Sequence, residues 1–407
     1  MGIVLLLFIV LLLFIFSQKF NITTFYLIFI SIVALTLGNY FISKDVIWFY
    51  NLIASLIFFM GYMIFKKIYI FNAKENAIKE KKANKIDYFN KYFVIIIVFF
   101  VIYHFVVSGI PILSNNVEIS RFDFTSSGLF GIPGRMVQYG IYFITFYTGY
   151  FYLFKGTQKK YFILSLIIFV LCKLISGFKG GMYDVLVMIV LLMSLNKTNV
   201  SIKKFINGKV ICIVLVAIIF ASFVVSQYSY SSVSKYNNVA EYLFDRVTVI
   251  QAEAGNYMLK NISKKNYFYN DFVYYLRKYI KIDLDETTGF FTLEKIVSAS
   301  KNSVPLSNSY YIVSVTIGAF NEMWFNTNLI FAFIFMFFYG AIYGTIEKIM
   351  KRGNLNAFQY ASLGLAIYMI LLYFSKGGLM YYITNYILLI ALFSAFRFIA
   401  RFFYRKV

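Results

Sequence analysis

The sequence predicts an all-α, polytopic membrane protein with about 11 transmembrane helices, forming a single transmembrane domain over residues 1–407. Hydrophobic residues make up 61% of the chain and charged residues only 14%. Soluble domains are typically about 45–50% apolar and about 25% charged. The apolar residues gather in long runs, and the basic residues gather between alternate runs. These three observations indicate that lipid, rather than water, surrounds most of the chain.

Runs of about 20 apolar residues can cross a hydrocarbon core about 30 Å thick. The first run has no basic region before it and no small-residue cleavage site, so we expect a retained helix rather than a signal peptide. The expected spans are residues 2–16, 22–38, 46–65, 92–110, 136–154, 161–176, 182–195, 210–226, 325–346, 356–374 and 379–399.

The basic residues of the short loops predict the orientation, because they favour the cytoplasmic side. Most of them lie in the segments 17–21, 66–91, 155–160, 196–209, 347–355 and from Arg397 onward. The opposite short loops contain only Lys44, Arg121, Arg135, Lys179 and Lys376. We therefore expect the N-terminus outside, the C-terminus inside and 66–91 as a basic cytoplasmic loop. The net charge of +22 then reflects topology, so we expect no nucleic-acid partner.

Two longer segments fall outside the cell in this topology. Residues 111–135 form the first candidate functional loop, and residues 227–308 form a large extracytoplasmic loop. Loops of this length are usually functional. Within the larger loop, 240–260 and 271–281 have helical periodicity, which predicts short amphipathic helices at the outer membrane surface. Segment 309–320 is apolar but too short to span, so we expect it to re-enter the membrane or lie flat.

A Lys-Gly-Gly turn occurs twice, as SGFKGGM at 176–182 and as FSKGGLM at 374–380. Glycine lets backbone N–H groups approach a ligand, and the helix N-terminus that follows favours an anion such as pyrophosphate. The simpler alternative is a tight hairpin whose lysine reaches water. Lys173 and Asp184 flank the first turn and could form an ion pair with each other or with Lys179. The candidate anion-binding residues of the two turns are Lys179, Gly180, Gly181, Lys376, Gly377 and Gly378.

Arginines in the two outer loops are further candidates for phosphate binding, because the guanidinium group matches phosphate with two hydrogen bonds. They are Arg121 and Arg135 in the first loop, and Arg246 and Arg277 in the second. Surface ion pairing is the alternative explanation for Arg121, which lies next to Asp123 in sequence.

Three residues are candidates for a general base. Glu322 is the only acid in a long apolar stretch, and a carboxyl at a dry boundary has a raised pKa that suits this role. Asp123 and His104 are the next candidates. The alternatives are a helix N-terminal charge for Glu322 and simple packing for His104. With one histidine and only Cys172 and Cys212 as cysteines, we expect no metal site and no cofactor.

Several segments then follow in a characteristic order: SGIPILS, an outer loop with RFD, the turn SGFKGG, a long outer loop, GAFNEMWFN and YGAIYG. This layout resembles the oligosaccharide repeat-unit polymerases, the Wzy-type polymerases of O-antigen and capsule assembly. The resemblance covers the chain from about residue 92 onward and rests on the order of the segments rather than on one motif.

The resemblance implies a GT-C-like fold of the O-antigen polymerase and ligase type. Such enzymes act at the outer face of the bacterial plasma membrane on undecaprenyl-pyrophosphate-linked oligosaccharides. They transfer the growing chain onto a new lipid-linked unit. The implied partners are this substrate, membrane lipid, and the flippase and chain-length regulator of the same pathway. Glu322 matches the family's acid, and the family's basic loop residues match Arg121, Lys179, Arg246 or Arg277, and Lys376.

The chain departs from the family pattern at several positions. Lys179-Gly180 and Lys376-Gly377 stand where the family often has Arg-Gly. The Arg-x10-Gly spacing of some members is not met, since Gly131 comes one residue early after Arg121. These departures leave the substrate and the residue roles open.

The chemistry of glycosyl transfer fits the outer residues independently of the resemblance. Cations must stabilise the leaving pyrophosphate, and a base must take the proton of the acceptor hydroxyl. We therefore expect metal-independent transfer. The alternatives are a ligase-like glycosyltransferase and, in another class, a transporter or flippase of lipid-linked sugars. Transporters often have Gly/Pro-interrupted spans, whereas Pro111, Pro133 and Pro305 all lie outside the expected spans.

Overall fold

A computed structural model of the chain describes residues 23–24, 27, 46–67, 83–114, 120, 124, 132–176, 181–195, 249–280, 292–303, 315–351 and 355–405. Every regular element in these ranges is a helix, as the sequence predicts. The chain divides into two compact units. The first comprises residues 1–68, 240–348 and 367–385, and the second comprises residues 69–239, 349–366 and 386–407.

Five helical segments are long and apolar enough to cross a membrane, which supports the expected membrane protein. They are Ile47–Lys66, Tyr92–Leu113, Leu329–Lys351, Ala357–Lys376 and Leu379–Ile399. They belong to the helices α4 (Ile47–Lys67), α5 (Ala83–Ser108), α18 (Leu329–Lys351), α19 (Ala357–Lys376) and α20 (Leu379–Arg405), and the second segment continues past α5 to the end of the turn Pro111–Leu113. Each corresponds to an expected span, although α18 begins four residues later than expected because a separate helix precedes it. The count of eleven spans and the orientation stay predictions.

The other expected spans are shorter helices or lie outside the described residues. Helices α8 (Ile141–Lys155), α9 (Lys159–Ile175) and α10 (Gly181–Ser194) have 15, 17 and 14 residues. A π-helical segment, Met136–Gly140, continues directly into α8. Expected spans 2–16 and 210–226, and most of 22–38, fall outside the described residues.

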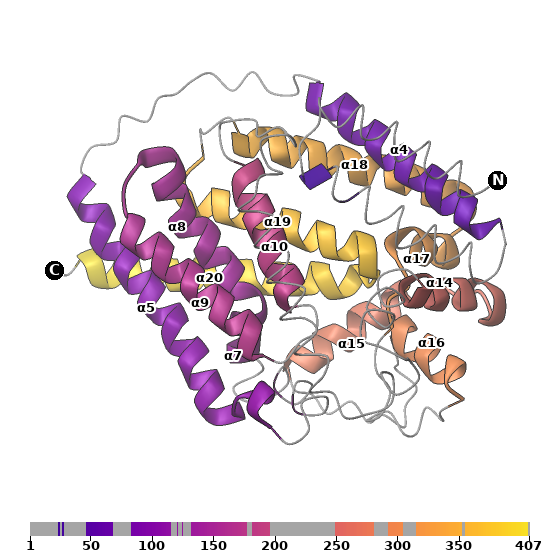
Figure 1. The fold of residues 1–407 in the computed structure, drawn as a ribbon, viewed down its shortest axis with the longest axis horizontal. Coiled ribbons are helices and arrows are strands. Elements are labelled where there is room, and N and C mark those ends of the chain that lie inside the picture. Colours follow the sequence, from indigo (N-terminus) through magenta and orange to yellow (C-terminus); the bar gives the residue numbers. More distant parts are fainter. Residues whose placement is uncertain are drawn as a thin grey trace, which may run out of the picture. The chain divides into compact units, whose positions relative to one another are not determined.

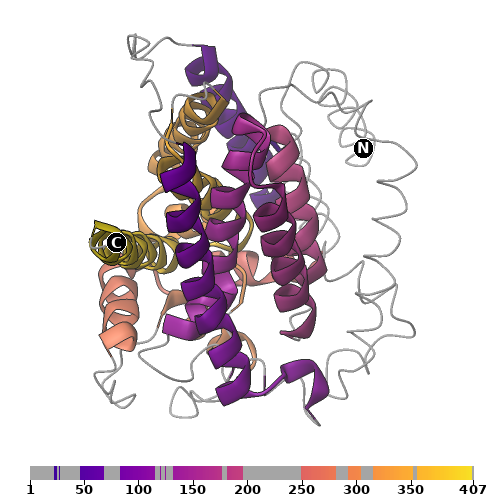
Figure 2. The ribbon, with the colours of Figure 1, turned by 90° about the vertical axis from the view of Figure 1, so that its left-hand side faces the viewer.

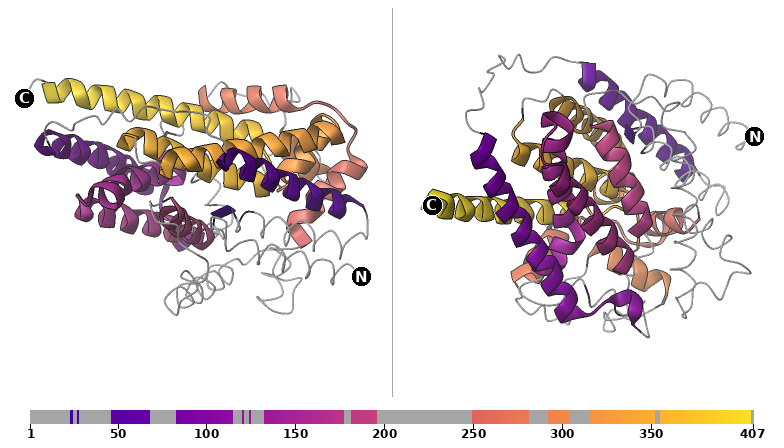
Figure 3. Two further views of the ribbon diagram at one scale, coloured as in Figure 1. Left: turned by 90° about the horizontal axis from the view of Figure 1, so that it is seen from above. Right: turned by 60° about the vertical axis from the view of Figure 1, so that its left-hand side comes forward.

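In the first unit, α4 and α18 lie side by side with their backbones in close contact (Figure 3). Three glycines make this approach possible. A Cβ atom at Gly340 would collide with the carbonyl oxygen of Phe58, and one at Gly61 would collide with that of Phe337. Gly344 faces α4 in the same way. Small residues permit close helix contact in this manner inside membranes.

A buried carboxylate also links these two helices. Glu347 is fully buried, although the sequence placed it in the expected loop 347–355. Its carboxylate pairs with Lys66 at 3.2 Å and accepts a hydrogen bond from the Tyr62 hydroxyl at 3.0 Å. The pairing explains how an acid can be buried there, because an unpaired charge in such a place is costly.

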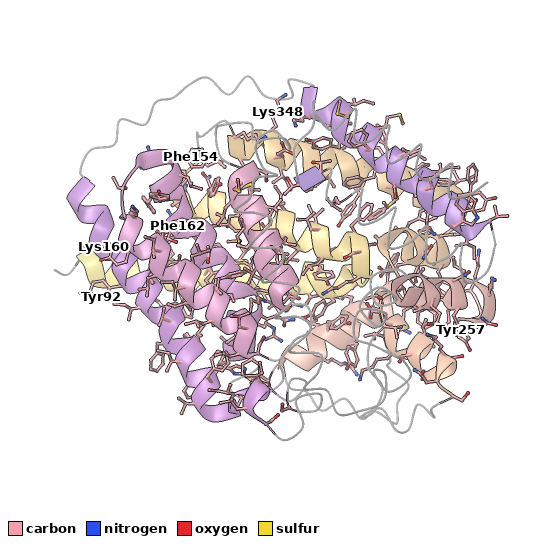
Figure 4. All side chains as sticks on the ribbon, viewed as in Figure 1. Tyr92, Phe154, Lys160, Phe162, Tyr257 and Lys348 are labelled. Carbon is pink, nitrogen blue, oxygen red and sulfur yellow. The ribbon has the colours of Figure 1, made fainter. Side chains whose placement is uncertain are left out.

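The segment 227–308, which the sequence predicts as the large outer loop, contains helices α14 (Val249–Asn261), α15 (Phe268–Ile280) and α16 (Leu293–Lys301), and α17 (Ala319–Asn326) follows it (Figure 1). The first two correspond to the expected helices 240–260 and 271–281. The Tyr257 hydroxyl of α14 lies 2.9 Å from the Ser300 hydroxyl of α16 (Figure 4). These helices and the segments beside them share an apolar core of Ala254, Met258, Tyr267, Leu293, Val297, Ile317 and Phe325.

In the second unit, α5, α8, α9 and α10 lie side by side (Figure 2). Aromatic rings fill the space between them, with Phe143 stacked on Phe393 at 4.1 Å and Phe93 against Tyr147 at 5.0 Å between ring centroids. Helix α5 begins at Ala83, within the segment 66–91, and its membrane-crossing part begins at Tyr92, where the expected span begins. The described parts of segment 111–135, the expected first outer loop, include Pro111–Leu113, a 3-10 turn, and α7 (Ile132–Arg135).

Candidate functional site

Glu322 is the centre of the candidate site. It lies in the first turn of α17 and is 1% exposed. Its carboxylate accepts hydrogen bonds from two consecutive backbone N–H groups, at 2.7 Å from Gly378 and at 3.2 and 3.3 Å from Leu379. Leu379 is the first residue of α20. A carboxylate at this position satisfies N–H groups that a helix start leaves without partners.

The turn that binds Glu322 depends on its two glycines. Gly377 and Gly378 have φ angles of +80° and +81°, which residues with a Cβ atom rarely adopt. A Cβ atom at Gly378 would also collide with the carboxylate of Glu294. The N–H group of Ile317 donates to the carbonyl of Lys376 at 2.9 Å, which joins the turn to the segment before α17.

Two asparagines fix the helix that carries Glu322. The Asn51 side chain of α4 donates to the Asn321 side chain at 3.0 Å, and Asn321 donates to the Ile317 carbonyl at 3.1 Å. At the other end of α17, the Asn326 side chain accepts the N–H group of Tyr267 at 2.7 Å. The sequence NEMWFN therefore holds α17 from both ends.

Two further buried carboxylates approach the same region. Asp271 of α15 is 2% exposed, and its carboxylate accepts the N–H group of Leu293 at 3.0 Å. Glu294 of α16 is buried and accepts a hydrogen bond from the Tyr275 hydroxyl at 3.4 Å. We call Asp271, Glu294 and Glu322 the carboxylate cluster.

The cluster favours protonated carboxyl groups. Burial, followed by the charges of Glu294 and Asp271, raises the pKa of Glu322 well above its usual value. Burial raises the pKa of Glu294 to about 7, and burial together with the charge of Glu294 raises that of Asp271 to about 8. Among the residues that the structure describes, no ion pair joins the cluster to a lysine or arginine. In the same part of the chain, no three acidic, histidine or cysteine side chains could hold a metal ion.

The second Lys-Gly-Gly turn uses its N–H groups in a way that the sequence did not suggest. The N–H group of Gly377 donates to the carbonyl of Tyr373 at 2.9 Å, and that of Gly378 donates to Glu322. An external anion could bind the Gly378 N–H group only by displacing Glu322, and the Gly377 N–H group already has a backbone partner. The Lys376 side chain is exposed, so it can contact an anion while Glu322 stays in place.

The remaining described candidates lie at several places. Arg277 of α15 is half-buried in the first unit. His104 and Arg135 belong to the second unit. His104 is 1% exposed, its ring packs against Phe124 at 4.2 Å between centroids, and its Nδ1 lies 3.4 Å from the Ser108 hydroxyl. This packing agrees with the simpler interpretation of His104.

The first Lys-Gly-Gly turn is described only in part. Gly181 begins α10, and a Cβ atom there would collide with the carbonyl oxygen of Lys173. The Lys173 ammonium pairs with Asp184 at 3.2 Å, which is one of the ion pairs that the sequence suggested. It also donates to the Gln138 carbonyl at 3.0 Å, within the π-helical segment. The charge of Lys173 is therefore balanced inside the protein.

Five predicted site residues lie outside the described residues: Arg121, Asp123, Lys179, Gly180 and Arg246. Their roles stay predictions.

Asp271 and Glu294 are the residues that sequence reasoning missed. Asp271 is surrounded in sequence by Tyr, Phe and Val, and an acid among apolar residues of an amphipathic helix could have been recognised as buried. Glu294 follows Thr292, whose hydroxyl accepts the Lys295 N–H group as a helix cap. The pattern Thr-Leu-Glu signals a helix start, but nothing in it places Glu294 near Glu322.

Comparison of the chain with models of known protein families, with curated proteins and with solved structures found no match.

Proposed function

We propose that this protein polymerises oligosaccharide repeat units carried on a polyprenyl pyrophosphate, of the undecaprenyl type, at the outer face of the bacterial plasma membrane. The observation that carries the proposal is the buried Glu322 carboxyl, which lies next to a helix start and has a raised pKa. The long apolar helices support a membrane-bound substrate. The resemblance in layout to the Wzy-type polymerases supplies the substrate class.

Glu322 acts as the general base in this proposal, in the ionised form whose carboxylate accepts the Gly378 and Leu379 N–H groups. It takes the proton of the acceptor hydroxyl, whose oxygen attacks the anomeric carbon of the growing chain. The bond between that carbon and the pyrophosphate oxygen breaks, and the pyrophosphate leaves with the electron pair. Lys376 and Arg277 are the described candidates that stabilise the negative charge of the leaving group. Because Glu322 is 1% exposed, the acceptor reaches it only after the Gly377–Gly378 turn or the segment 315–318 moves.

A proton-coupled transporter of lipid-linked sugars is the second candidate. The carboxylate cluster favours it, because buried carboxyl groups that share protons are typical of transport pathways. A ligase that transfers the finished glycan once uses the same chemistry as the polymerase and differs only in its acceptor.

Purified protein is incubated with lipid-linked repeat unit from cells that lack the gene, with a metal chelator present, and the products are separated by size. We expect a ladder at repeat-unit intervals. Replacement of Glu322 by Gln removes the base while keeping the shape of the side chain, so the rate should fall by about 100- to 10,000-fold.

Glu253→Gln is the matched control, since Glu253 is an acid of the same unit that pairs with Lys301 at the surface of α14. It should leave the ladder unchanged. An unchanged substrate with every variant, including the natural chain, would contradict the polymerase and favour transport. A single transfer to a different acceptor would favour the ligase.

A further inference from the structure

Helix α15 exposes its apolar side chains and buries an acidic one. Tyr269, Phe272 and Leu276 are 73%, 38% and 36% exposed. Their spacing of three and four residues places them along one face of the helix. On the opposite face, Asp271 is 2% exposed and Tyr275 is 8% exposed. We call Tyr269, Phe272 and Leu276 the α15 stripe.

This arrangement is the reverse of that of a helix in water. A helix on the surface of a soluble protein turns its apolar stripe to the core and its charges to solvent. The core-facing side of α15 instead carries Asp271, which caps α16 through the Leu293 N–H group. Among the residues that the structure describes in the first unit, none covers the α15 stripe, whose three side chains are exposed. An apolar environment for the stripe therefore has to come from outside these residues.

Basic residues stand at the borders of the stripe. Lys264 and Lys265 lie four and three residues before the start of α15 and are exposed. Arg277 is half-buried and lies at the side of the stripe, one position after Leu276. Lysine and arginine beside an apolar stripe are typical of helices that lie in the headgroup region, where they attract anionic lipids. The same compact unit contains the membrane-crossing candidates Ile47–Lys66 and most of Leu329–Lys351.

We propose that the α15 stripe lies in the lipid bilayer, with Lys264 and Lys265 on anionic phospholipid headgroups, so that α15 is an interfacial helix. The cluster acid Asp271 is then on the protein side of a helix whose other side is lipid. This inference does not depend on the proposed function, because it follows from exposure and charge alone.

Nitroxide labels at single cysteines test the proposal in the full chain. Cys172 and Cys212 are first replaced by serine, and cysteine is then placed at Tyr269, Phe272 or Leu276. The labelled proteins are reconstituted into vesicles of phosphatidylcholine and phosphatidylglycerol. Oxygen concentrates in lipid and a nickel chelate stays in water, so the ratio of their collision rates reports depth. A label at the exposed Ser300 of α16 is the control.

We expect the ratio of the oxygen collision rate to the nickel collision rate to be several-fold higher at all three stripe positions than at Ser300. We also expect the ratio to fall when phosphatidylglycerol is omitted, and to lose that dependence in the variant Lys264→Gln with Lys265→Gln. High nickel access at the three positions would show that the stripe faces water and would overturn the proposal. Low access to both reagents, with spin coupling between labels, would show a second copy of the chain there and would also overturn it.

Discussion

The charge state of the carboxylate cluster should control the stability of the fold around it. The pKa of Glu294 is raised to about 7 from 4.5, and that of Asp271 to about 8 from 3.8. The folded protein therefore keeps protons that the unfolded chain releases. Each such group lowers the free energy of unfolding as the pH rises from its unfolded pKa to its folded pKa, by up to about 1.4 kcal/mol per pH unit.

We accordingly expect the thermal midpoint of the detergent-solubilised protein to fall between about pH 5 and about pH 8. Glu294→Gln removes one titrating group and should flatten this dependence, whereas the surface variant Glu253→Gln should not. The measurement is tryptophan fluorescence during heating, at several pH values. If the thermal midpoint changed equally with pH in Glu294→Gln and in the natural chain, the protons that stabilise the folded protein would not be bound by the carboxylate cluster.

Gly378 and Gly109 allow backbone strain to be separated from crowding. Both have positive φ angles, of +81° and +74°. A Cβ atom at Gly378 would collide with Glu294, whereas one at Gly109 would meet nothing within 4 Å. An alanine in this conformation costs roughly 1–2 kcal/mol by itself.

Gly378→Ala should therefore lower the thermal midpoint more than Gly109→Ala does. It should also lower transfer activity, because the Gly378 N–H group binds Glu322. If the two variants lowered the thermal midpoint equally, the collision of the added Cβ atom with Glu294 would not contribute to the loss of stability.

The sequence predicts the chemical character of the site residues more readily than it predicts which residues they contact. The isolation of Glu322 in an apolar stretch predicts a buried acid with a raised pKa, and the structure places it so. The glycines of the second Lys-Gly-Gly turn predict N–H groups near an anion, and the anion in the structure is Glu322 itself. The sequence could not show this, because 56 residues separate Glu322 from Gly378 and no local pattern encodes such a pairing.

At the level of elements, close packing of α4 on α18 is the contact most sensitive to a single side chain. Gly340→Leu should destabilise the protein by about 1–3 kcal/mol or more, because the added atoms meet the Phe58 carbonyl and the backbone cannot yield as a side chain can. Ile342→Leu is the control, since Ile342 lies on the same helix and is 52% exposed. The measurement is the thermal midpoint of each variant. A loss no larger for Gly340→Leu than for Ile342→Leu would contradict this close contact.

Long apolar helices were the elements that the sequence predicted best, since length and hydropathy are properties of a segment alone. The short helices between them were predicted less well. Segment 309–320 was expected to re-enter the membrane or lie flat; residues 309–314 lie outside the described residues, so this stays a prediction. Helix α17 (Ala319–Asn326), which Thr327 and Asn328 separate from α18, was not expected as a separate element. Asn321 and Asn326 hold α17 through contacts with Asn51 and Tyr267, and such distant partners are invisible in a local pattern.

For the whole molecule, the last three apolar helices give the most direct test of the topology. Leu329–Lys351, Ala357–Lys376 and Leu379–Ile399 follow one another after the large loop. Three crossings put the loop and the C-terminus on opposite sides of the membrane, whatever the number of spans before them. The excess of basic residues near the C-terminus predicts that this end lies inside.

We expect alkaline phosphatase inserted after Lys265 to be active, because it folds only outside the cytoplasm. Green fluorescent protein fused after Val407 should fluoresce, because it folds inside. Phosphatase inserted after Lys82, in the basic segment 66–91, should be inactive. Activity after both Lys82 and Lys265 would contradict the odd number of crossings that the expected topology places between them. An inactive phosphatase after Lys265 would place the carboxylate cluster on the cytoplasmic side, where the proposed lipid-linked substrate is not polymerised.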